Sequence, residues 1–415
     1  MSLLWNGYRL LAPALGALAP AARMFASPLE RPLWGERMGD VHATGGVHAW
    51  VHAASLGESS AVAPLLVALR SAQPHARIWC TSTTRTGRER LLRTGVPCSL
   101  APIDSPQAAR RFFRGIRPER VLLIETELWP HWLMRARADG VPVAIVSARL
   151  SERSVRRYQS LGPGLRELVA GLAAILCQSD ADAERWQAIG ATPSRLSVVG
   201  NLKEDGLPSA SEDRIAERRL LGLDPARPVL VLGSVRPGEV RLLSRAWRSL
   251  PDRVREHWQV VSVPRHPKAL EELQSEAAAG GVEVANGATA SAWRWDARTG
   301  VLADWYRVAE VAFVGGSLAP YGGHNPMEPA ACGAAVLMGP HHASQRPAVE
   351  ALQKAGGLRV VAAGAELAAA LASVLGDPAV RRRMGDAASE VARSRRGAAR
   401  RTVHALMKGG LWPVA

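Results

Sequence analysis

The sequence predicts an α/β protein made of two doubly wound domains, each a parallel sheet with helices on both faces. Three observations lead to this fold class. Short apolar segments alternate with amphipathic segments of helical periodicity, which is typical of parallel sheets covered by helices. The alternation forms two series, and the polar stretch 204–219 separates them. The length of 415 residues also suits two domains.

The first series lies between residues 47 and 201. Its strands are expected at 47–55, 77–83, 119–125, 141–148, 172–179 and 195–201. Its helices are expected at 58–72, 86–94, 128–140 and 180–190. The strands are short and rich in Val, Ile and Leu, whereas the helices repeat apolar residues every three or four positions.

The second series has the same pattern. Its strands are expected at 228–234, 258–264, 311–317 and 334–340, and its helices at 238–250, 326–333, 365–377 and, in one long run, 380–404. We therefore expect four segments: an N-terminal membrane-associating segment (1–40), a Rossmann-like domain (41–205), a linker (206–225) and a second Rossmann-like domain (226–415). Ligands of such sheets bind beyond the carboxyl ends of the strands, so the chemistry is expected there, in a cleft between the domains.

The charge of the chain indicates an anionic partner. Basic residues number 52 and acidic residues 37, which gives a net charge of +15. Aromatic residues are only 5%, and no motif of nucleic-acid-binding proteins is present, so a phosphorylated substrate or an anionic membrane surface is favoured over nucleic acid. The four cysteines form no CxxC pair, and the sequence holds no cluster of metal ligands, so no metal site is expected.

The N-terminus is apolar, but it is too short to cross a membrane. Residues 10–22 carry no charge and lie between two arginines, whereas a spanning helix needs about 20 apolar residues. Three interpretations are open: a signal peptide, a first helix packed on the domain, and an anchor in the membrane interface. We favour the anchor, with Trp5, Tyr8 and Leu10 in lipid, because a secreted protein would carry four unpaired thiols.

Carboxylates follow two strands of the first domain. Ser55 and Glu58 have the spacing of a capping box, and Gly57 between them permits close approach of a ligand, so capping and catalysis are both open for Glu58. Glu125 and Glu127 follow a buried strand. The pKa of a carboxylate there is expected to rise unless a basic group lies near, so these residues are either salt-bridge partners or active-site carboxylates.

Basic and hydroxyl side chains follow three further strands, where anion binding and a solvated loop are both open. They are Arg149 and Arg153, Ser234 and Arg236, and Arg265 and His266.

The segment 313–329 has four glycines in one loop. They indicate that the backbone comes close to a ligand. Asn325 suits a helix N-cap and Pro326 the first helical position, and such a helix start is a ready phosphate site. Glu328 either completes the cap or binds ribose hydroxyls.

Ten segments, in one order, resemble a known family. They are GERMG, HAASLGE, TRTGRE, PIDSP, ETELWP, SARLSERS, QSDADAERW, GNLK, VPRHP and FVGGSLAPYGGHNPMEPAACG. The resemblance is to the bacterial 3-deoxy-D-manno-octulosonic acid (Kdo) transferases of lipopolysaccharide synthesis, and it extends from about residue 3 to residue 405.

The resemblance implies a GT-B-type fold, with an acceptor-binding first domain, a donor-binding second domain and a last helix that crosses back. It implies CMP-Kdo as the donor, no further cofactor, and the phosphorylated lipid A precursor as the acceptor. It also implies a place on the cytoplasmic face of the bacterial inner membrane, peripheral or N-terminally anchored. Oligomeric state and the number of Kdo units transferred are not implied.

The resemblance also assigns site residues. It makes Glu58 the general base and Glu125 a second active-site carboxylate. The residues assigned to the donor are Lys203, Ser234, Arg236, Arg265, His266, Gly315, Gly316, Ser317, Gly322, Gly323, His324, Asn325 and Glu328. The residues assigned to the acceptor are Gly57, Arg149 and Arg153.

The sequence departs from the family pattern at two donor segments. The family's STHEGE is SVRPGE at 234–239, and the family's GDTMGEL loop is shortened before residue 306. An alternative is therefore a GT-B transferase that uses a different nucleotide sugar. A third interpretation is a non-catalytic protein that binds a membrane surface or nucleic acid. Such a protein has no need of these carboxylates.

Overall fold

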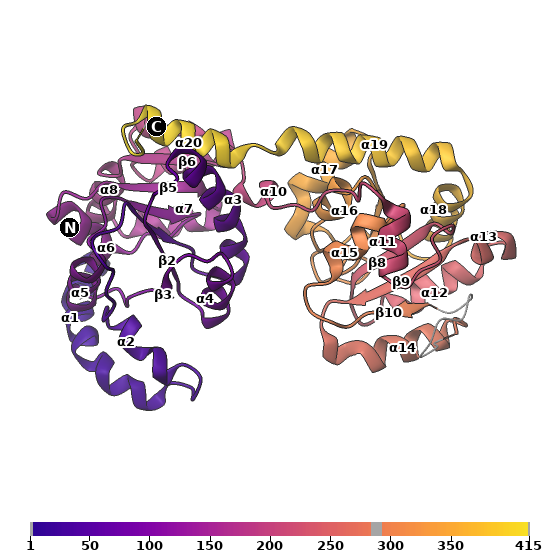
Figure 1. Cartoon of the computed structure of the whole chain (residues 1–415), viewed down its shortest axis with the longest axis horizontal. Helices are drawn as coiled ribbons and strands as arrows, with labels where there is room; N and C mark the ends of the chain where they lie inside the picture. The colour runs from indigo at the N-terminus through magenta and orange to yellow at the C-terminus, as the bar shows by residue number, and fades with distance from the viewer. Residues whose placement is uncertain (1–2, 284–292, 414–415) are drawn as a thin grey trace. The chain divides into compact units, whose positions relative to one another are not determined.

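The computed structural model describes residues 3–283 and 293–413, and the chain forms two compact units (Figure 1). Unit 1 comprises Met1–Gly206 and Arg395–Ala415, and unit 2 comprises Leu207–Ser394. Each unit has one sheet in which every strand pair is parallel. The predicted fold class is therefore confirmed: the chain has two doubly wound α/β units of the GT-B type.

The sheet of unit 1 has seven strands in the order β3-β2-β1-β4-β5-β6-β7. They are β1 (Ala49–His52), β2 (Ile78–Ser82), β3 (Cys98–Leu100), β4 (Val121–Ile124), β5 (Val143–Ala148), β6 (Ala174–Cys177) and β7 (Leu196–Val198). The first strand, β1, lies between β2 and β4, so the winding of the chain reverses there. The carboxyl ends of β1 and β4 flank this reversal, which is where doubly wound sheets bind ligands.

Helices cover both faces of this sheet. One face packs against α3 (Leu56–Ala72) and α20 (Ala398–Lys408), and the other against α5 (Pro106–Ile116), α6 (Pro130–Ala138) and α8 (Pro163–Ala170). The remaining helices of this unit are α1 (Leu3–Ala22), α2 (Trp34–Arg37), α4 (Arg85–Leu92), α7 (Glu152–Ser160), α9 (Asp180–Ala188) and α10 (Leu202–Asp205). Two apolar layers bury the central strands, which explains their continuous apolar sequences.

The sheet of unit 2 repeats this plan with the order β10-β9-β8-β11-β12-β13. Its strands are β8 (Val229–Val235), β9 (Gln259–Pro264), β10 (Arg294–Trp295), β11 (Val311–Val314), β12 (Ala335–Met338) and β13 (Leu358–Val360). Its helices are α11 (Arg214–Leu220), α12 (Val240–Arg248), α13 (Asp252–His257), α14 (Leu270–Ala279), α15 (Leu302–Val308), α16 (Met327–Ala331), α17 (Arg346–Lys354), α18 (Ala365–Gly376) and α19 (Pro378–Arg395). The winding reverses between β8 and β11.

The segment 206–225, expected to be a linker, contains the helix α11. Arg218 of this helix pairs with Glu310, and Glu217 accepts a hydrogen bond from Arg307 at 2.7 Å. Both contacts hold α11 within unit 2.

The expected single helix over 380–404 is wrong, because two helices, α19 and α20, cover this range and residues 396–397 between them are not helical. Gly397 has φ +90°, and the Asp205 carboxylate accepts hydrogen bonds from the N–H groups of Gly397, Ala398 and Ala399. Asp205 thereby caps α20, which belongs to unit 1 whereas most of α19 belongs to unit 2.

The first helix is partly built into unit 1. Trp5 is only 5% exposed and packs in the core, so its expected position in lipid is wrong. Tyr8 is half-buried, and its hydroxyl donates to the Asp104 carboxylate. The side chain of Leu10 lies outside the described residues. Among the helices that the structure describes, none is both long and apolar enough to cross a bilayer.

Candidate functional site

The candidate site residues gather at the carboxyl ends of strands on both sides of each winding reversal. In unit 1, Glu58 follows β1 and Glu125 follows β4. In unit 2, Arg236 follows β8 and the loop that begins at Gly315 follows β11. Fold and sequence therefore agree on one place in each unit for ligand chemistry.

Glu58 is fixed in the first turn of α3. Its carboxylate accepts hydrogen bonds from the N–H of Ala54 at 2.7 Å and from the hydroxyl of Ser55 at 3.1 Å. Its own N–H donates to the Ser55 hydroxyl oxygen at 3.2 Å. This reciprocal pairing is a capping box, so the capping interpretation is confirmed, and the same contacts hold the carboxylate in one orientation.

The environment of Glu58 suits a proton acceptor. Burial raises the pKa of its carboxyl, and the negative charge of Glu127 and then that of Glu125 raise it further. Among the described residues, no Lys, Arg or His forms an ion pair with this carboxylate. A base with a raised pKa and no cationic partner binds a proton more readily than an ordinary carboxylate does.

Glu125 differs from Glu58 because it has a cationic partner. The ammonium group of Lys203 lies 2.5 Å from Glu125 Oε1. The salt bridge that the sequence left open therefore exists, and it fixes the position of the Glu125 carboxylate. Lys203, which the family resemblance assigned to the donor, lies on α10 of unit 1.

Glu127, expected after the buried strand, belongs to a polar chain whose other members the sequence did not predict. His52, fully buried on β1, contacts the Thr81 hydroxyl at 2.8 Å through Nδ1. Its Nε2 lies 3.5 Å from Glu127 Oε2, which also accepts a hydrogen bond from Trp129 at 2.7 Å. Glu127 is thus oriented by two aromatic rings, and its charge acts on Glu58.

Backbone strain marks the same strand ends. Among the described non-glycine residues, four have positive φ, and three of them follow or end strands at the expected site: Glu125 (62°), Ser147 (53°) and Ser234 (56°). Such conformations cost about 1–3 kcal/mol each and tend to gather at functional sites.

The acceptor residues expected from the resemblance differ in setting. Gly57 is exposed, and a Cβ there would meet only the Ser55 hydroxyl, at 3.8 Å, so the fold itself does not require glycine. Arg149 and Arg153 are exposed, and no ion pair or side-chain hydrogen bond of their guanidinium groups is found among the described residues. The Thr126 hydroxyl donates to the backbone oxygen of Arg149, which ties the ends of β4 and β5 together.

The glycines after β11 are needed by the fold itself. Gly316, Gly322 and Gly323 have φ of 70°, 87° and 78°, which favour glycine. A Cβ on Gly315 would lie 2.5 Å from the backbone oxygen of Ser234, so β11 and β8 approach too closely for a side chain. Gly315 and Gly323 also donate their N–H groups within the unit, at 2.8 and 2.7 Å.

Glu239 organises this loop, and the sequence analysis did not identify it. Its fully buried carboxylate accepts four backbone hydrogen bonds, from Arg236 at 2.9 Å, Gly316 at 2.7 Å, and Ser317 and Leu318 at 2.8 Å each. The N–H groups of Gly316 and Ser317 are therefore already used. Side chains beside this loop are further groups that a ligand could meet there.

Those side chains are predominantly basic. Arg236 lies over the Tyr321 ring at 4.1 Å and bonds His266 Nε2 at 2.9 Å. Burial and the charges of Arg265, Arg236 and His266 together lower the pKa of His324 to about 4, which places all four groups together. His324 is therefore neutral near pH 7, and its buried Nε2 has no hydrogen-bond partner among the residues that the structure describes.

Glu328 lies beside this basic group at the start of α16. Asn325 accepts a hydrogen bond from the N–H of Met327 at 3.0 Å and donates to Glu328 at 3.3 Å. The helix begins at Met327, one residue later than expected, because the Asn325 side chain caps Met327 and leaves Pro326 at the cap position. Burial raises the pKa of Glu328, and the contacts with Asn325 and Arg265 oppose this rise.

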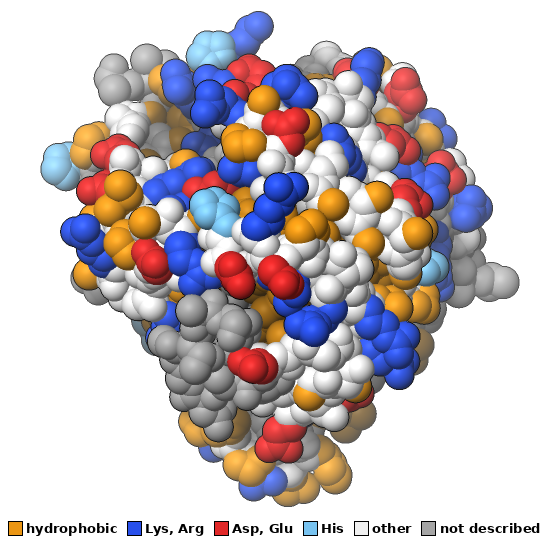
Figure 2. All heavy atoms as spheres, turned by 90° about the vertical axis from the view of Figure 1, so that its right-hand side faces the viewer, with side chains coloured by type: hydrophobic (Ala, Val, Ile, Leu, Met, Phe, Trp, Pro, Cys, Tyr) orange, Lys and Arg blue, Asp and Glu red, His pale blue; other side chains and the backbone are white. Residues whose placement is uncertain are grey.

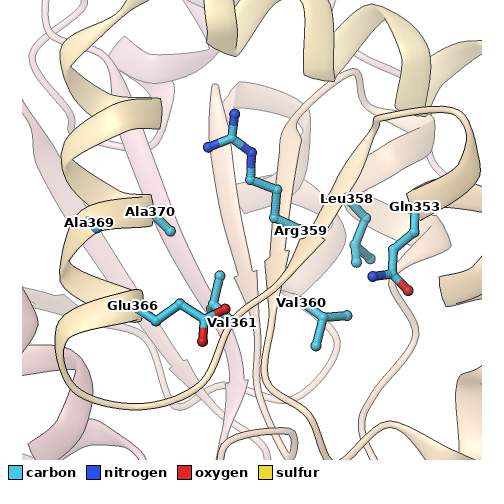
Figure 3. A pocket seen from close by; sticks show the side chains of 8 residues that line it. All are labelled: Gln353, Leu358, Arg359, Val360, Val361, Glu366, Ala369 and Ala370. Carbon is cyan, nitrogen blue, oxygen red and sulfur yellow. The ribbon is translucent and has the colours of Figure 1, made fainter.

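Two cavities of unit 2 differ in their relation to these residues. One of about 320 Å³ lies beside the glycine loop and is lined by Gly322, His341, His342 and Arg346, of which only Gly322 was expected. The other, of about 480 Å³, lies between β13 and α18 (Figure 3). None of the expected site residues lines it, so its size alone does not make it part of the site.

Basic side chains do not dominate the face of the molecule that Figure 2 shows. On the face that Figure 2 shows, Lys and Arg side chains are interspersed with Asp and Glu. Within the described ranges, no group of three or more His, Cys, Asp and Glu residues is arranged to hold a metal ion.

Comparisons with known proteins show which family the chain resembles. Residues 33–206 match the family model described as 3-deoxy-D-manno-octulosonic-acid transferase (kdotransferase). The chain is 36% identical over 376 residues to the 3-deoxy-D-manno-octulosonic acid transferase of Bordetella pertussis, with 86% of each chain covered. It is 30% identical over 369 residues to the corresponding Haemophilus influenzae protein, again with 86% of each chain covered.

A solved structure supports the fold. The UDP-GlcNAc 2-epimerase of Neisseria meningitidis superposes with a TM-score of 0.61 at 13% identity, over 87% of this chain and 99% of that chain. Identity at this level shows the fold alone, whereas the two transferases show the relationship. The chain belongs to the 3-deoxy-D-manno-octulosonic acid transferase family and is a glycosyltransferase of that family.

Proposed function

We propose that this glycosyltransferase moves Kdo from CMP-Kdo to a hydroxyl of the lipid A precursor, lipid IVA, with inversion at the anomeric carbon. The observation that carries the proposal is Glu58: a fixed carboxylate with a raised pKa and no cationic partner, at the strand end where ligands of this fold bind.

Glu58 acts as the general base. The acceptor oxygen attacks the anomeric carbon of Kdo while its proton moves to the Glu58 carboxylate, and the bond from that carbon to the CMP phosphate breaks. CMP leaves with the bonding electrons from the opposite face, which inverts the configuration. Glu58 then releases its proton to water. A positioned base of this kind contributes about 10²–10⁴-fold to rate.

Glu125 and Lys203 act as a charged pair beside the base. The ammonium group holds the Glu125 carboxylate in place, and Glu125 supports the positive charge that develops on the sugar ring. Glu58 and Glu125 therefore have different tasks because one lacks a cation and the other has one.

The basic side chains of unit 2 hold the donor. Arg236 and Arg265 pair with the phosphate of CMP and with the carboxylate of Kdo, and neutral His324 donates or accepts a hydrogen bond without adding charge. Glu328 binds the ribose hydroxyls. A single phosphate needs less charge compensation than a pyrophosphate, so we propose that no metal or other cofactor takes part.

The N-terminal segment places the enzyme on an anionic membrane. Between Leu11 and Leu29, a range that includes η1 (Arg23–Phe25), large apolar side chains are exposed: Leu11 63%, Leu18 66%, Met24 69%, Phe25 88% and Leu29 64%. Exposed Arg23 lies among them. We propose peripheral binding at the cytoplasmic face of the inner membrane. Phe25→Ser with Met24→Ser should reduce co-sedimentation with phosphatidylglycerol vesicles; unchanged binding contradicts the proposal.

The test of the reaction is incubation of the purified protein with CMP-Kdo and lipid IVA, with the product measured by mass spectrometry. Addition of one or more Kdo units is expected. UDP- and other CMP-sugars serve as competing donors, because the changed segment 234–239 also suits a transferase with a different donor. Transfer from one of these, and none from CMP-Kdo, rejects the proposal.

A further inference from the structure

Between α3 and α4 of unit 1 lies a cavity of about 390 Å³ that none of the expected site residues lines. We call it the α3–α4 groove. Its apolar part consists of Ala63, Leu66 and Val67, and its charged part of Arg70, Arg90 and Arg93. Leu66 is buried and forms the floor, whereas Val67 is 68% exposed at the rim.

The arginines of this groove differ from their neighbours on the same helices. On α4, Arg85 pairs with Glu89 and Arg88 pairs with Glu36. Arg90 and Arg93, and Arg70 on α3, are exposed, and no ion pair or side-chain hydrogen bond of theirs is found among the described residues.

No carboxylate lines the groove. Three positive charges therefore converge on one hollow without compensation, which is the electrostatic complement of an anion.

The apolar floor narrows the choice of anion. A free phosphate gains nothing from Leu66 and Val67, and a bilayer surface needs a flat face rather than a hollow one. A molecule that carries a phosphate on an apolar stem satisfies both halves of the groove, because the guanidinium groups bind the phosphate and the floor accepts the hydrocarbon.

The groove is connected to the candidate base through one helix. Ser59, the residue after Glu58, lines one end of the groove, and its hydroxyl donates to the Ser55 backbone oxygen at 2.8 Å. Arg70 lines the groove eleven residues further along α3, which corresponds to roughly 16 Å at 1.5 Å per residue. An anion held by Arg70 is therefore remote from a hydroxyl that reacts at Glu58.

We propose that the α3–α4 groove is a subsite for the acceptor lipid, in which Arg70, Arg90 and Arg93 bind a phosphate group remote from the reacting hydroxyl and Leu66 and Val67 contact its hydrocarbon. The proposal rests on the proposed function, because it takes the acceptor to be the phosphorylated glycolipid. The subsite selects the substrate and takes no part in the chemical step.

The test compares two triple variants with the same change in charge. The groove variant removes the three positive charges of the groove and carries Arg70→Gln, Arg90→Gln and Arg93→Gln. The control variant removes three exposed arginines of unit 2 and carries Arg245→Gln, Arg253→Gln and Arg382→Gln. Binding of lipid IVA and of phosphatase-treated lipid IVA, both in detergent micelles, is measured at equilibrium without any donor.

The groove variant should bind lipid IVA at least about tenfold more weakly and lose the preference for the phosphorylated form, while the control variant keeps it. In turnover assays, the KM for lipid IVA should rise by a similar factor while kcat is unchanged, since remote contacts stabilise ground and transition states alike. Val67→Gln, at an exposed position, should weaken both forms of the lipid equally.

Two results overturn the proposal: a groove variant that keeps the phosphate preference, or a control variant that loses it too. The binding measurement uses no donor. If the wild type transfers no Kdo from CMP-Kdo, the proposed reaction fails while the groove is still tested.

Discussion

The two strand-end sites of this protein have the same architecture and opposite charge. In unit 1 the reversal between β1 and β4 gathers carboxylates, Glu58 and Glu125 with Glu127 beside them. In unit 2 the reversal between β8 and β11 gathers Arg236, Arg265 and two histidines. The fold fixes where ligands bind, and the residues after each strand decide whether that place accepts a proton or holds an anion.

The largest expected effect tests the carboxylate half of this comparison. Glu58→Gln keeps the shape of the side chain but removes the base, so kcat should fall at least about a hundredfold in the CMP-Kdo assay. Donor binding, measured by titration with CMP, should be unchanged. Glu184→Gln, an exposed carboxylate of the same unit, is the control. Full turnover of the Glu58 variant contradicts the assigned base.

The next-largest effect tests the contacts that hold the basic site of unit 2 in place. Glu239→Ala leaves four N–H groups of the loop without their acceptor, and the free energy of unfolding should fall by about 3 kcal/mol, measured with urea. Glu239→Gln, which keeps one acceptor oxygen, should lose less. If both variants unfold like the wild type, Glu239 does not organise the loop.

A smaller effect separates donor binding from chemistry. Arg265→Ala should raise the KM for CMP-Kdo about tenfold, as expected for loss of one charge-assisted contact, and leave the KM for the lipid unchanged. Arg253→Ala on α13 removes a comparable exposed charge and should have no effect. A change in the lipid KM instead would mean that the two sites do not divide the substrates as proposed.

The smallest effect tests how the charge of Glu127 raises the pKa of Glu58 in unit 1. Because Glu58 must be ionised to act as a base, activity falls as pH drops through its raised pKa. Glu127→Gln removes one charge that raises this pKa, so the acid limb of the kcat/KM profile should move to lower pH. Since burial is the larger cause, the limb should stay above the ordinary glutamate value. A limb that does not move contradicts the coupling.

The central strands are predictable from sequence, and the strands that were missed lie at sheet edges. All ten expected strands are present, including the edge strand β7, and the three that were missed, β3, β10 and β13, are edge strands of two or three residues. An edge strand is buried by fewer neighbours and therefore carries a weaker apolar signal. The capping of Glu58 by Ser55 was predictable because the contact is local: both partners lie within one helical turn.

The contacts that sequence could not reveal join distant segments. Lys203 reaches Glu125 across 78 residues, and Glu239 reaches Ser317 across 78. Nothing in local periodicity distinguishes such a carboxylate from an ordinary one at a helix start. The same limit explains Trp5: its spacing matches a membrane anchor, and only the packing of the domain shows that the ring is buried.

The return of the chain to unit 1 has a consequence for biosynthesis. The apolar layer that covers α3 includes Ala398, Val403, Leu406 and Trp412 from the last turns of the polypeptide. A ribosome therefore releases the final pieces of the first half only after the second half has emerged. Until then, the nascent first half exposes the apolar surface of α3, to which chaperones can bind. A stop codon shortly before residue 395 should therefore yield aggregates rather than a working fragment.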